Sequence, residues 1–282
     1  MTDTSLVLSH YEKPGLLDRI LTGLEKMKLT PAQATVEILG PVDEFHIRGA
    51  GATADLVNML DVDAKAHVLD AGSGLGGPAR RLASMRGCRV TGIDLTTEYC
   101  DVAETLTEWT GLSECVSFRQ GDVTDMSNTQ NATYDAAWTI HVGMNIADRR
   151  GFYSEIARVL KPGARFIIYD IFSTGKGEIE FPVPWAEAAA ASHLFTIDEV
   201  KTTLEAVGFT ITGEQDDTDA GIAFITKGLK TTMAAGQPMA LGLHLVPGPK
   251  TPVMIANVQK NLADGLISLN ILICEKPRGA QS

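Results

Sequence analysis

The chain of 282 residues has only four cysteines, and they form neither a disulfide framework nor a metal-site pattern. Cys88, Cys100, Cys115 and Cys274 include no C-x-x-C pair and have no partner histidine at metal-ligand spacing. The histidines show no such spacing among themselves either, so we expect no metal ion. Reduced cysteines are typical of the cytoplasm, which is the location that we predict.

A long apolar run and a basic N-terminal segment are also missing. No stretch approaches the roughly 20 consecutive apolar residues that a membrane-spanning helix needs. The first fifteen residues lack the basic start and apolar core of an export signal. We therefore expect no membrane partner, and the apolar fraction of 44% favours a soluble, globular protein.

Positive charge is scarce, because 24 Lys and Arg residues face 35 Asp and Glu residues, for a net charge of −11. Such a balance is poorly suited to holding a phosphate backbone, so we expect no nucleic-acid partner. It suits the approach of a cationic ligand, although it serves solubility equally well. The length fits one large α/β domain with additions.

What the chain has instead is a strand, glycine turn, helix and strand pattern between residues 67 and 95. A short apolar run leads into four glycines, followed by helical spacing and a second apolar run. Gly72 and Gly74 lack the Cβ that would keep a ligand off the backbone. Asp94 ends the second strand about 20 residues on, where a carboxylate can accept both hydroxyls of a ribose. The pattern predicts a nucleoside-containing cofactor.

The same glycine spacing, Gly72-x-Gly74-x-x-Gly77, also fits a dinucleotide-binding turn. Two features argue against NAD. Asp70 would bring negative charge to the pyrophosphate, whereas it would attract an ammonium or sulfonium group. After a third apolar run, Asp122 can accept a hydrogen bond from an exocyclic amine of adenine, and Val123 offers the ring an apolar surface.

An ordered series of motifs between residues 61 and 216 resembles the class I S-adenosylmethionine-dependent methyltransferases. The series consists of VLDAGSGLGG, GIDL, GDVTD, YDAAWTI and RVLKPGARFIIYDI. FHIRGAGAT before this series, and GGPAR within the glycine turn, resemble the small-molecule branch. That branch includes the sarcosine and dimethylglycine N-methyltransferases and the ubiquinone-type C-methyltransferases. S-adenosyl-L-methionine is the cofactor that the resemblance implies.

The resemblance implies an α/β fold with a doubly wound, mostly parallel, seven-stranded Rossmann-like sheet. An N-terminal helical lid would occupy residues 1–60 and the cofactor-binding core residues 61–217. Residues 218–264 exceed what a minimal core needs and are interpreted as a substrate-cap insert. The last strand and tail of the core would follow at 265–282.

Hydrophobic periodicity places the elements of this core. The chain in order gives helical spacing over 16–24, 96–110, 147–160 and 196–207, and strands over 134–140, 165–172, 209–215 and 267–274.

The family resemblance also implies roles for the N-terminal region. Tyr11 and the segment around Arg48 would line the methionine end of the cofactor, with Arg48 near its carboxylate. Alternatively, Tyr11 is a packing residue and Arg48 pairs with Asp43 or Glu44. The full cofactor set that we predict is Tyr11, Arg48, Asp70, Gly72, Ser73, Gly74, Asp94, Leu95, Asp122, Val123 and His141.

His141 follows the fourth strand, at the edge where ligands bind in open α/β sheets. It is the best-placed titratable side chain for removing a proton from an acceptor, and it is our catalytic candidate. Alternatively, it only contacts the cofactor or the strand end. Asn145, Tyr169 and Trp185 are candidates for the substrate pocket, although Tyr and Trp are as often packing residues.

These patterns predict an enzyme that methylates a small molecule, at an amine, thiol or hydroxyl in preference to carbon. Two alternatives stay open: an NAD-type oxidoreductase, and a methyltransferase-like protein that uses the sulfonium cofactor for regulation or for non-methylating chemistry. A homodimer is an open alternative to a monomer.

Overall fold

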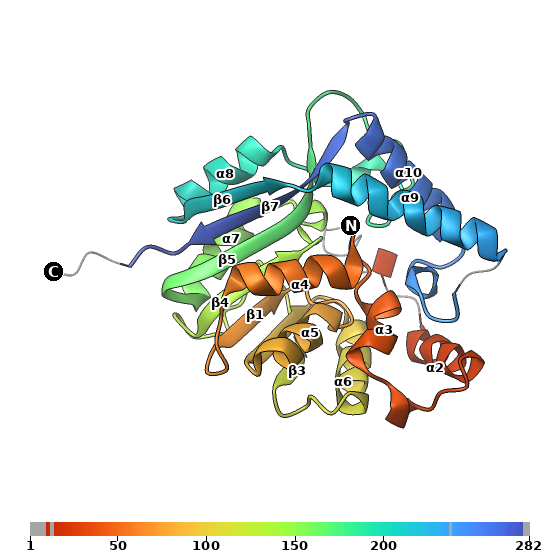
Figure 1. The fold of residues 1–282 in the computed structure, drawn as a ribbon. Helices are drawn as coiled ribbons and strands as arrows, with labels where there is room; N and C mark the ends of the chain where they lie inside the picture. Colours follow the sequence, from red (N-terminus) through yellow and green to blue (C-terminus); the bar gives the residue numbers. More distant parts are fainter. Residues whose placement is uncertain (1–9, 12–13, 237–238, 279–282) are drawn as a thin grey trace.

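The computed structural model describes residues 10–11, 14–236 and 239–278, in which one sheet of seven strands is covered by helices (Figure 1). The strands are β1 (His67–Ala71), β2 (Arg89–Asp94), β3 (Val116–Gln120), β4 (Tyr134–Ile140), β5 (Leu160–Ser173), β6 (Thr210–Asp216) and β7 (Ile267–Glu275).

The helices precede, separate and follow these strands. The α-helices are α2 (Leu16–Lys26), α3 (Val36–Asp43), α4 (Gly49–Leu60), α5 (Gly77–Arg86), α6 (Thr97–Trp109), α7 (Arg149–Val159), α8 (Ile197–Ala206), α9 (Thr218–Ala235) and α10 (Thr251–Ala263). Short 3₁₀ turns are η1 (Pro31–Gln33), η2 (Gly143–Asn145), η3 (Ala189–Ala191) and η4 (Leu243–Leu245).

The strand order is β3-β2-β1-β4-β5-β7-β6, and only β7 runs antiparallel to its neighbours. The predicted α/β fold with a mostly parallel seven-stranded sheet is confirmed. Since β1 to β4 are parallel, their carboxyl ends meet at one edge of the sheet. The order reverses between β2-β1 and β4, the position at which open α/β sheets bind ligands.

Apolar side chains bury both faces of the sheet, as a parallel sheet requires. On one face, α4, α5 and α10 pack over strand residues such as Trp138. On the other face, α7 and α8 pack over residues such as Phe166. Both side chains are fully buried, so the central strands are hydrophobic on both sides, which explains why they were predicted as continuous apolar runs.

The N-terminal helices form a separate cluster with α6 and with the segment before α10. Leu16, Ile20 and Leu24 of α2 are buried in it, so the predicted amphipathic helix is present. Arg19 Nε donates a hydrogen bond to the carbonyl of Leu245 at 3.0 Å. A Cβ on Gly23 would lie 2.5 Å from Leu241 Cδ2, so α2 is in close contact with the 218–264 region.

The 218–264 region is built from α9 and α10, which the sequence pattern did not reveal as helices. α9 buries only Gly221 and Ile225, so it has no continuous apolar stripe. The two helices pack on each other and on β7 (Figure 1). In the described ranges, no helix is long and apolar enough to cross a membrane.

Candidate cofactor and acceptor site

A cavity of about 390 Å³ opens where β1, β2, β3 and β4 end. Its walls come from the glycine turn, the strand ends, the residues after β4 and the N-terminal helices. The lining residues are Tyr11, Asp43, Phe45, His46, Asp70, Gly72, Ser73, Gly74, Pro78, Asp94, Leu95, Thr96, Tyr99, Gly121, Asp122, Val123, Thr124, Ile140, His141, Val142, Asn145, Ile146, Ala147 and Asp148.

The glycine turn connects β1 to α5 through three left-handed glycines, two of which, Gly72 and Gly74, line the cavity. Gly72 has φ 81° and Gly74 has φ 52°, a region that favours glycine. A Cβ on Gly72 would lie 2.4 Å from Val142 Cγ2, and one on Gly74 would lie 3.1 Å from Phe45. These glycines are therefore needed for packing within the protein as well as for any approach of a ligand.

We predict that Gly72→Ala lowers the free energy of unfolding by about 3 kcal/mol. The left-handed backbone accounts for about 1 kcal/mol and overpacking against Val142 for about 2 kcal/mol. Urea unfolding followed by circular dichroism measures the loss. Gly111→Ala is the matched control, because Gly111 has φ 69° with nothing within 4 Å of its Cβ position. Equal losses at the two positions would contradict the packing argument.

Asp94 at the end of β2 is held in place by two backbone donors. Gly74 N donates to Oδ2 at 2.8 Å, and Thr96 N donates to Oδ1 at 2.9 Å. Burial raises the pKa of Asp94, and these N–H groups oppose the rise. Each carboxylate oxygen keeps a lone pair, so the pair can still accept two hydroxyls from a ligand in the cavity.

Asp70 is a second buried carboxylate at this edge, and it is 1% exposed. Its Oδ2 makes no hydrogen bond within 3.5 Å among the described residues, and neither does Ser73 Oγ, although the Trp138 indole lies near enough to lower the pKa of Asp70. Burial raises the pKa of Asp70 to about 7. A buried acceptor of this kind is stabilised by a positive group, so the cavity fits a cationic ligand better than a pyrophosphate.

The end of β3 supplies the other predicted wall. Asp122 Oδ1 accepts from Thr124 N at 2.8 Å and from Thr124 Oγ1 at 2.7 Å, which fixes the turn after the strand. Val123 and Leu95 lie beside it in the lining. This arrangement of one carboxylate and two apolar side chains suits an adenine ring.

His141 directly follows β4, with a left-handed φ of 54°. The backbone N–H of His141 donates to the backbone carbonyl of Tyr169 at 2.8 Å. The centroids of the two side-chain rings lie 5.2 Å apart. His141 Nε2 is buried, without a hydrogen-bond partner among the described residues. Burial, together with nearby His46, lowers its pKa well below the usual histidine value, so the ring is neutral near pH 7.

Tyr11 and Asn145 meet across the cavity. Tyr11 Oη donates to Asn145 Oδ1 at 3.3 Å, although the two residues lie far apart in the sequence. Burial raises the pKa of Tyr11, so its hydroxyl remains a donor. The structure thus brings both predicted residues into the lining, and their roles toward cofactor and substrate stay predictions.

The prediction for Arg48 requires correction, because its side chain does not belong to the cavity lining. Arg48 Nη1 bonds to Asp217 Oδ2 and Nη2 to Asp55 Oδ2, each at 2.6 Å. The alternative pairing with Asp43 or Glu44 is also wrong, because the partners of Arg48 are Asp55 in α4 and Asp217 before α9. With its charge satisfied by two carboxylates, Arg48 ties the start of α4 to the start of α9.

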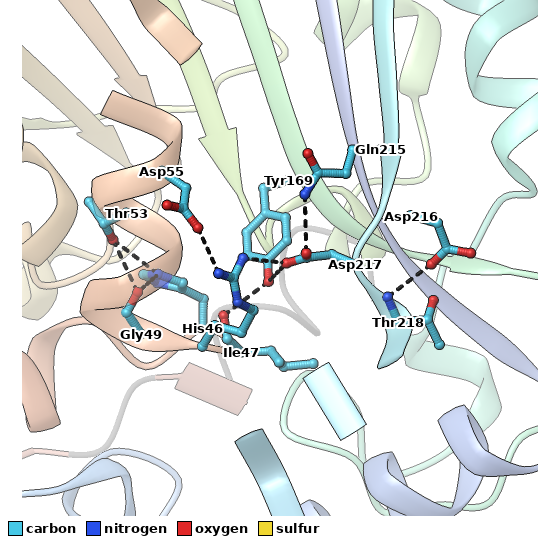
Figure 2. Close-up of polar contacts among 11 residues, drawn as sticks. His46, Ile47, Gly49, Thr53, Asp55, Tyr169, Gln215, Asp216, Asp217 and Thr218 are labelled. Atoms are coloured by element: carbon cyan, nitrogen blue, oxygen red, sulfur yellow. Dashed lines mark hydrogen bonds and ion pairs between the residues drawn. The ribbon is translucent and has the colours of Figure 1, made fainter. Parts of the chain in front are cut away.

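Tyr169 and Trp185 also lie outside the cavity lining, so their assignment to the substrate pocket is corrected. Tyr169 is fully buried, with its hydroxyl 3.1 Å from the Ile47 carbonyl and 3.2 Å from Asp217 Oδ2 (Figure 2). Trp185 is 4% exposed and donates to Ser192 Oγ at 2.9 Å. Both are packing residues with satisfied polar atoms.

We predict that Arg48→Met lowers the free energy of unfolding by about 2 kcal/mol, because it leaves buried Asp217 without its cation. Affinity for S-adenosylhomocysteine should change less than twofold, as measured by calorimetry. Asp55→Asn is the control, since it removes only the more exposed partner, and it should cost less than about 1 kcal/mol. A tenfold loss of affinity in Arg48→Met would restore the original prediction.

Several lining residues were not predicted from the sequence, among them Asp43, His46 and Tyr99. The FHIRG motif contains His46, but the resemblance implied a cofactor role only for Arg48 within it. Nothing in the local pattern distinguishes Asp43 from an ordinary acidic residue near a helix end. In the part of the chain that the structure describes, no group of three or more His, Cys, Asp or Glu side chains could hold a metal ion.

Residues 69–168 match the family model described as a methyltransferase domain. This match supports the resemblance to the class I S-adenosylmethionine-dependent methyltransferases. Sterol 24-C-methyltransferase ERG6B of Gibberella zeae is 33% identical over 178 residues, which cover 60% of this chain and 46% of that protein. The chain spans about half the length of the curated sterol methyltransferases that it matches.

Solved structures share the fold of this methyltransferase domain. Phosphoethanolamine N-methyltransferase 2 of Haemonchus contortus, in complex with S-adenosyl-L-methionine, superimposes with a TM-score of 0.69 at 19% sequence identity. The superposition covers 94% of this chain and 60% of that protein's chain. The [4+2]-cyclase SpnF superimposes with a TM-score of 0.66 at 22% sequence identity, over 93% of this chain and 96% of the SpnF chain. At these identities the likeness shows the fold alone.

Proposed function

We propose that the protein transfers a methyl group from S-adenosyl-L-methionine to a small-molecule acceptor. One observation carries the proposal. The glycine turn, Asp70 and the doubly anchored Asp94 meet in one cavity at the switch point of a methyltransferase-type sheet. When bound there, the cofactor would supply an electrophilic methyl group on a sulfonium.

Each part of the cavity has a task in this proposal. Asp94 would accept the ribose hydroxyls, and Asp122 with Val123 would hold the adenine. Asp70 would lie near the positive end of the molecule. Because the leaving thioether is neutral, the protein does not have to stabilise a developing anion. Its contribution is to orient the two reactants, which can lower the barrier by roughly 7–11 kcal/mol.

The acceptor in this proposal is an amine, thiol or hydroxyl that loses a proton. His141 is neutral, and its unbonded Nε2 is available to accept that proton. The described lining includes no lysine or arginine, and this favours an acceptor without phosphate groups. Its charged side chains are the aspartates Asp43, Asp70, Asp94, Asp122 and Asp148.

The insert at 218–264 supplies none of the described lining residues. It contacts α2 through Leu241 and Leu245, so it would hold the lid from outside rather than cover the acceptor directly. Closure of the lid over the bound molecules, with the insert as its support, would exclude water during transfer.

We also propose a cytoplasmic location. All four cysteines are free and three are buried, which supports a reducing compartment. A homodimer stays an open alternative.

Two measurements test the proposal. The purified protein is titrated with S-adenosylhomocysteine and, separately, with NADH, each followed by thermal unfolding. We expect a rise in Tm with the first ligand only; a rise with NADH alone would indicate the oxidoreductase. Product analysis then decides the chemistry, because fold alone does not. S-adenosylhomocysteine must appear in step with a methylated acceptor, and turnover of an acceptor without it would contradict methyl transfer.

A further inference from the structure

Two ion pairs connect the end of the α3 segment to α5. Arg80 Nη2 bonds to Asp43 Oδ2 at 2.7 Å, and Arg81 Nη2 lies 2.7 Å from Glu44 Oε1. Both carboxylate side chains are almost completely buried, at 1% and 0% exposure. The two pairs therefore make the same kind of connection between lid and core: the carboxylates are neighbours in the sequence, and so are the two arginines.

Only the first of these pairs faces the cavity. Asp43 belongs to the cavity lining and Glu44 does not. Asp43 Oδ1 has no hydrogen-bond partner among the described residues. The segment that carries Asp43 lies across the glycine turn, because a Cβ on Gly77 would be 2.5 Å from the Asp43 carbonyl and one on Gly74 would be 3.1 Å from Phe45. That Gly77 Cβ would also be 2.6 Å from Asp43 Oδ1, so this oxygen lies beside the start of α5.

Arg80 makes no hydrogen bond to this second oxygen: its Nη2 bonds to Oδ2, and its Nε has no partner among the described residues. Nη2 also donates to the Leu75 carbonyl at 2.5 Å, and Nη1 donates to Ala103 O and Thr107 Oγ1. Desolvation raises the pKa of Asp43 to about 6 in spite of Arg80. A buried carboxylate oxygen at a cavity wall is stabilised when a cationic ligand donates to it.

We propose that Asp43 is a further cofactor-binding residue, whose Oδ1 accepts a hydrogen bond from the ammonium group of the bound cofactor's amino-acid end. This inference rests on the proposed function. Asp43 then links the lid, the core helix α5 and the cofactor, and binding of the amino-acid end holds the lid segment against the glycine turn.

Calorimetry with two ligands tests the role of Asp43. S-adenosylhomocysteine contains the ammonium and a neutral sulfur, whereas 5′-methylthioadenosine keeps the adenosine and the sulfur but lacks the amino-acid end. We expect Asp43→Asn to weaken S-adenosylhomocysteine binding about 10-fold or more and 5′-methylthioadenosine binding less than twofold. Glu44→Gln is the matched control, because it breaks the neighbouring ion pair outside the cavity, and it should change neither affinity.

The outcomes separate the two levels of the proposal. If the wild-type protein binds neither ligand, the proposed function fails and this inference fails with it. If the wild type binds both, equal losses for the two ligands, or no loss, in Asp43→Asn would overturn only the role of Asp43. A selective loss in Glu44→Gln would do the same. Should Asp43→Asn not fold, Asp43→Asn with Arg80→Gln removes the buried ion pair as a unit, and the same selectivity is expected of it.

Discussion

Replacing His141 with alanine should lower methyl-transfer turnover about 10²- to 10⁴-fold, the range that a general base contributes. We expect the lower part of this range, because a base with a depressed pKa has a smaller driving force for taking a proton. Affinity for S-adenosylhomocysteine should change less than twofold. Turnover is followed by the formation of S-adenosylhomocysteine, and affinity is followed by calorimetry.

His67→Ala is the control for this substitution. His67 is a partly buried histidine at the other end of β1, where it bonds to Thr91 Oγ1 at 2.9 Å and lies outside the cavity lining. It should leave turnover within twofold of wild type. A loss under threefold in His141→Ala, with normal cofactor binding, would leave His141 as a contact that takes no proton.

The pH dependence of turnover gives an independent check on His141. Burial lowers its pKa, so the neutral, proton-accepting form persists as the pH falls through the usual histidine range. At saturating cofactor, where protonation of Asp70 in the free protein does not limit binding, turnover should therefore be level from about pH 8 to about pH 6.5, the ordinary histidine pKa, and decline only in more acidic buffer. Protonation also favours the unfolded chain, so stability is lost in the same acidic direction. A midpoint at or above the ordinary value would contradict this assignment.

Asp94→Ala should weaken S-adenosylhomocysteine binding by about 100-fold or more. Two hydrogen bonds to a charged carboxylate, each worth about 1.5 kcal/mol or more, would be lost. The Gly74 and Thr96 N–H groups would also lose their acceptor, so the turn itself becomes less well fixed. Calorimetry measures the affinity.

Asp101→Ala serves as the matched control for Asp94, since Asp101 is an exposed carboxylate on α6 outside the cavity. It carries the same change in net charge and should alter affinity less than twofold. If both variants weakened binding equally, a general charge effect would replace the specific contact.

The sequence alone predicts the sheet well, and the reason is physical. Strands β1, β4 and β7 are buried on both faces, so each is an almost continuous apolar run bounded by polar or glycine residues. α9 was missed because it is in contact with the core over a short part of its length. α10 does bury Met254, Val258 and Leu262 at helical spacing, a signal that the prediction did not use.

At the cavity, the sequence predicted the residues whose position follows from the strand ends. Asp70, Asp94 and His141 each stand at or just beyond a strand, so the topology places them. The prediction for Arg48 was wrong because its partner Asp217 is 169 residues away in the chain, so the pairing depends on tertiary structure. Asp43 was missed for the same reason, as only the folded chain brings it over the glycine turn.

The double backbone anchor of Asp94 has a consequence for how selectivity for the acceptor could change in evolution. Its carboxylate is oriented by the core alone, through the Gly74 and Thr96 N–H groups, so its position requires no donor from the N-terminal segment. Tyr11 and His46, by contrast, come from the N-terminal segment. Substitutions in the N-terminal segment can therefore change which methyl acceptors related proteins bind. The Asp94 contact to the adenosyl group stays the same.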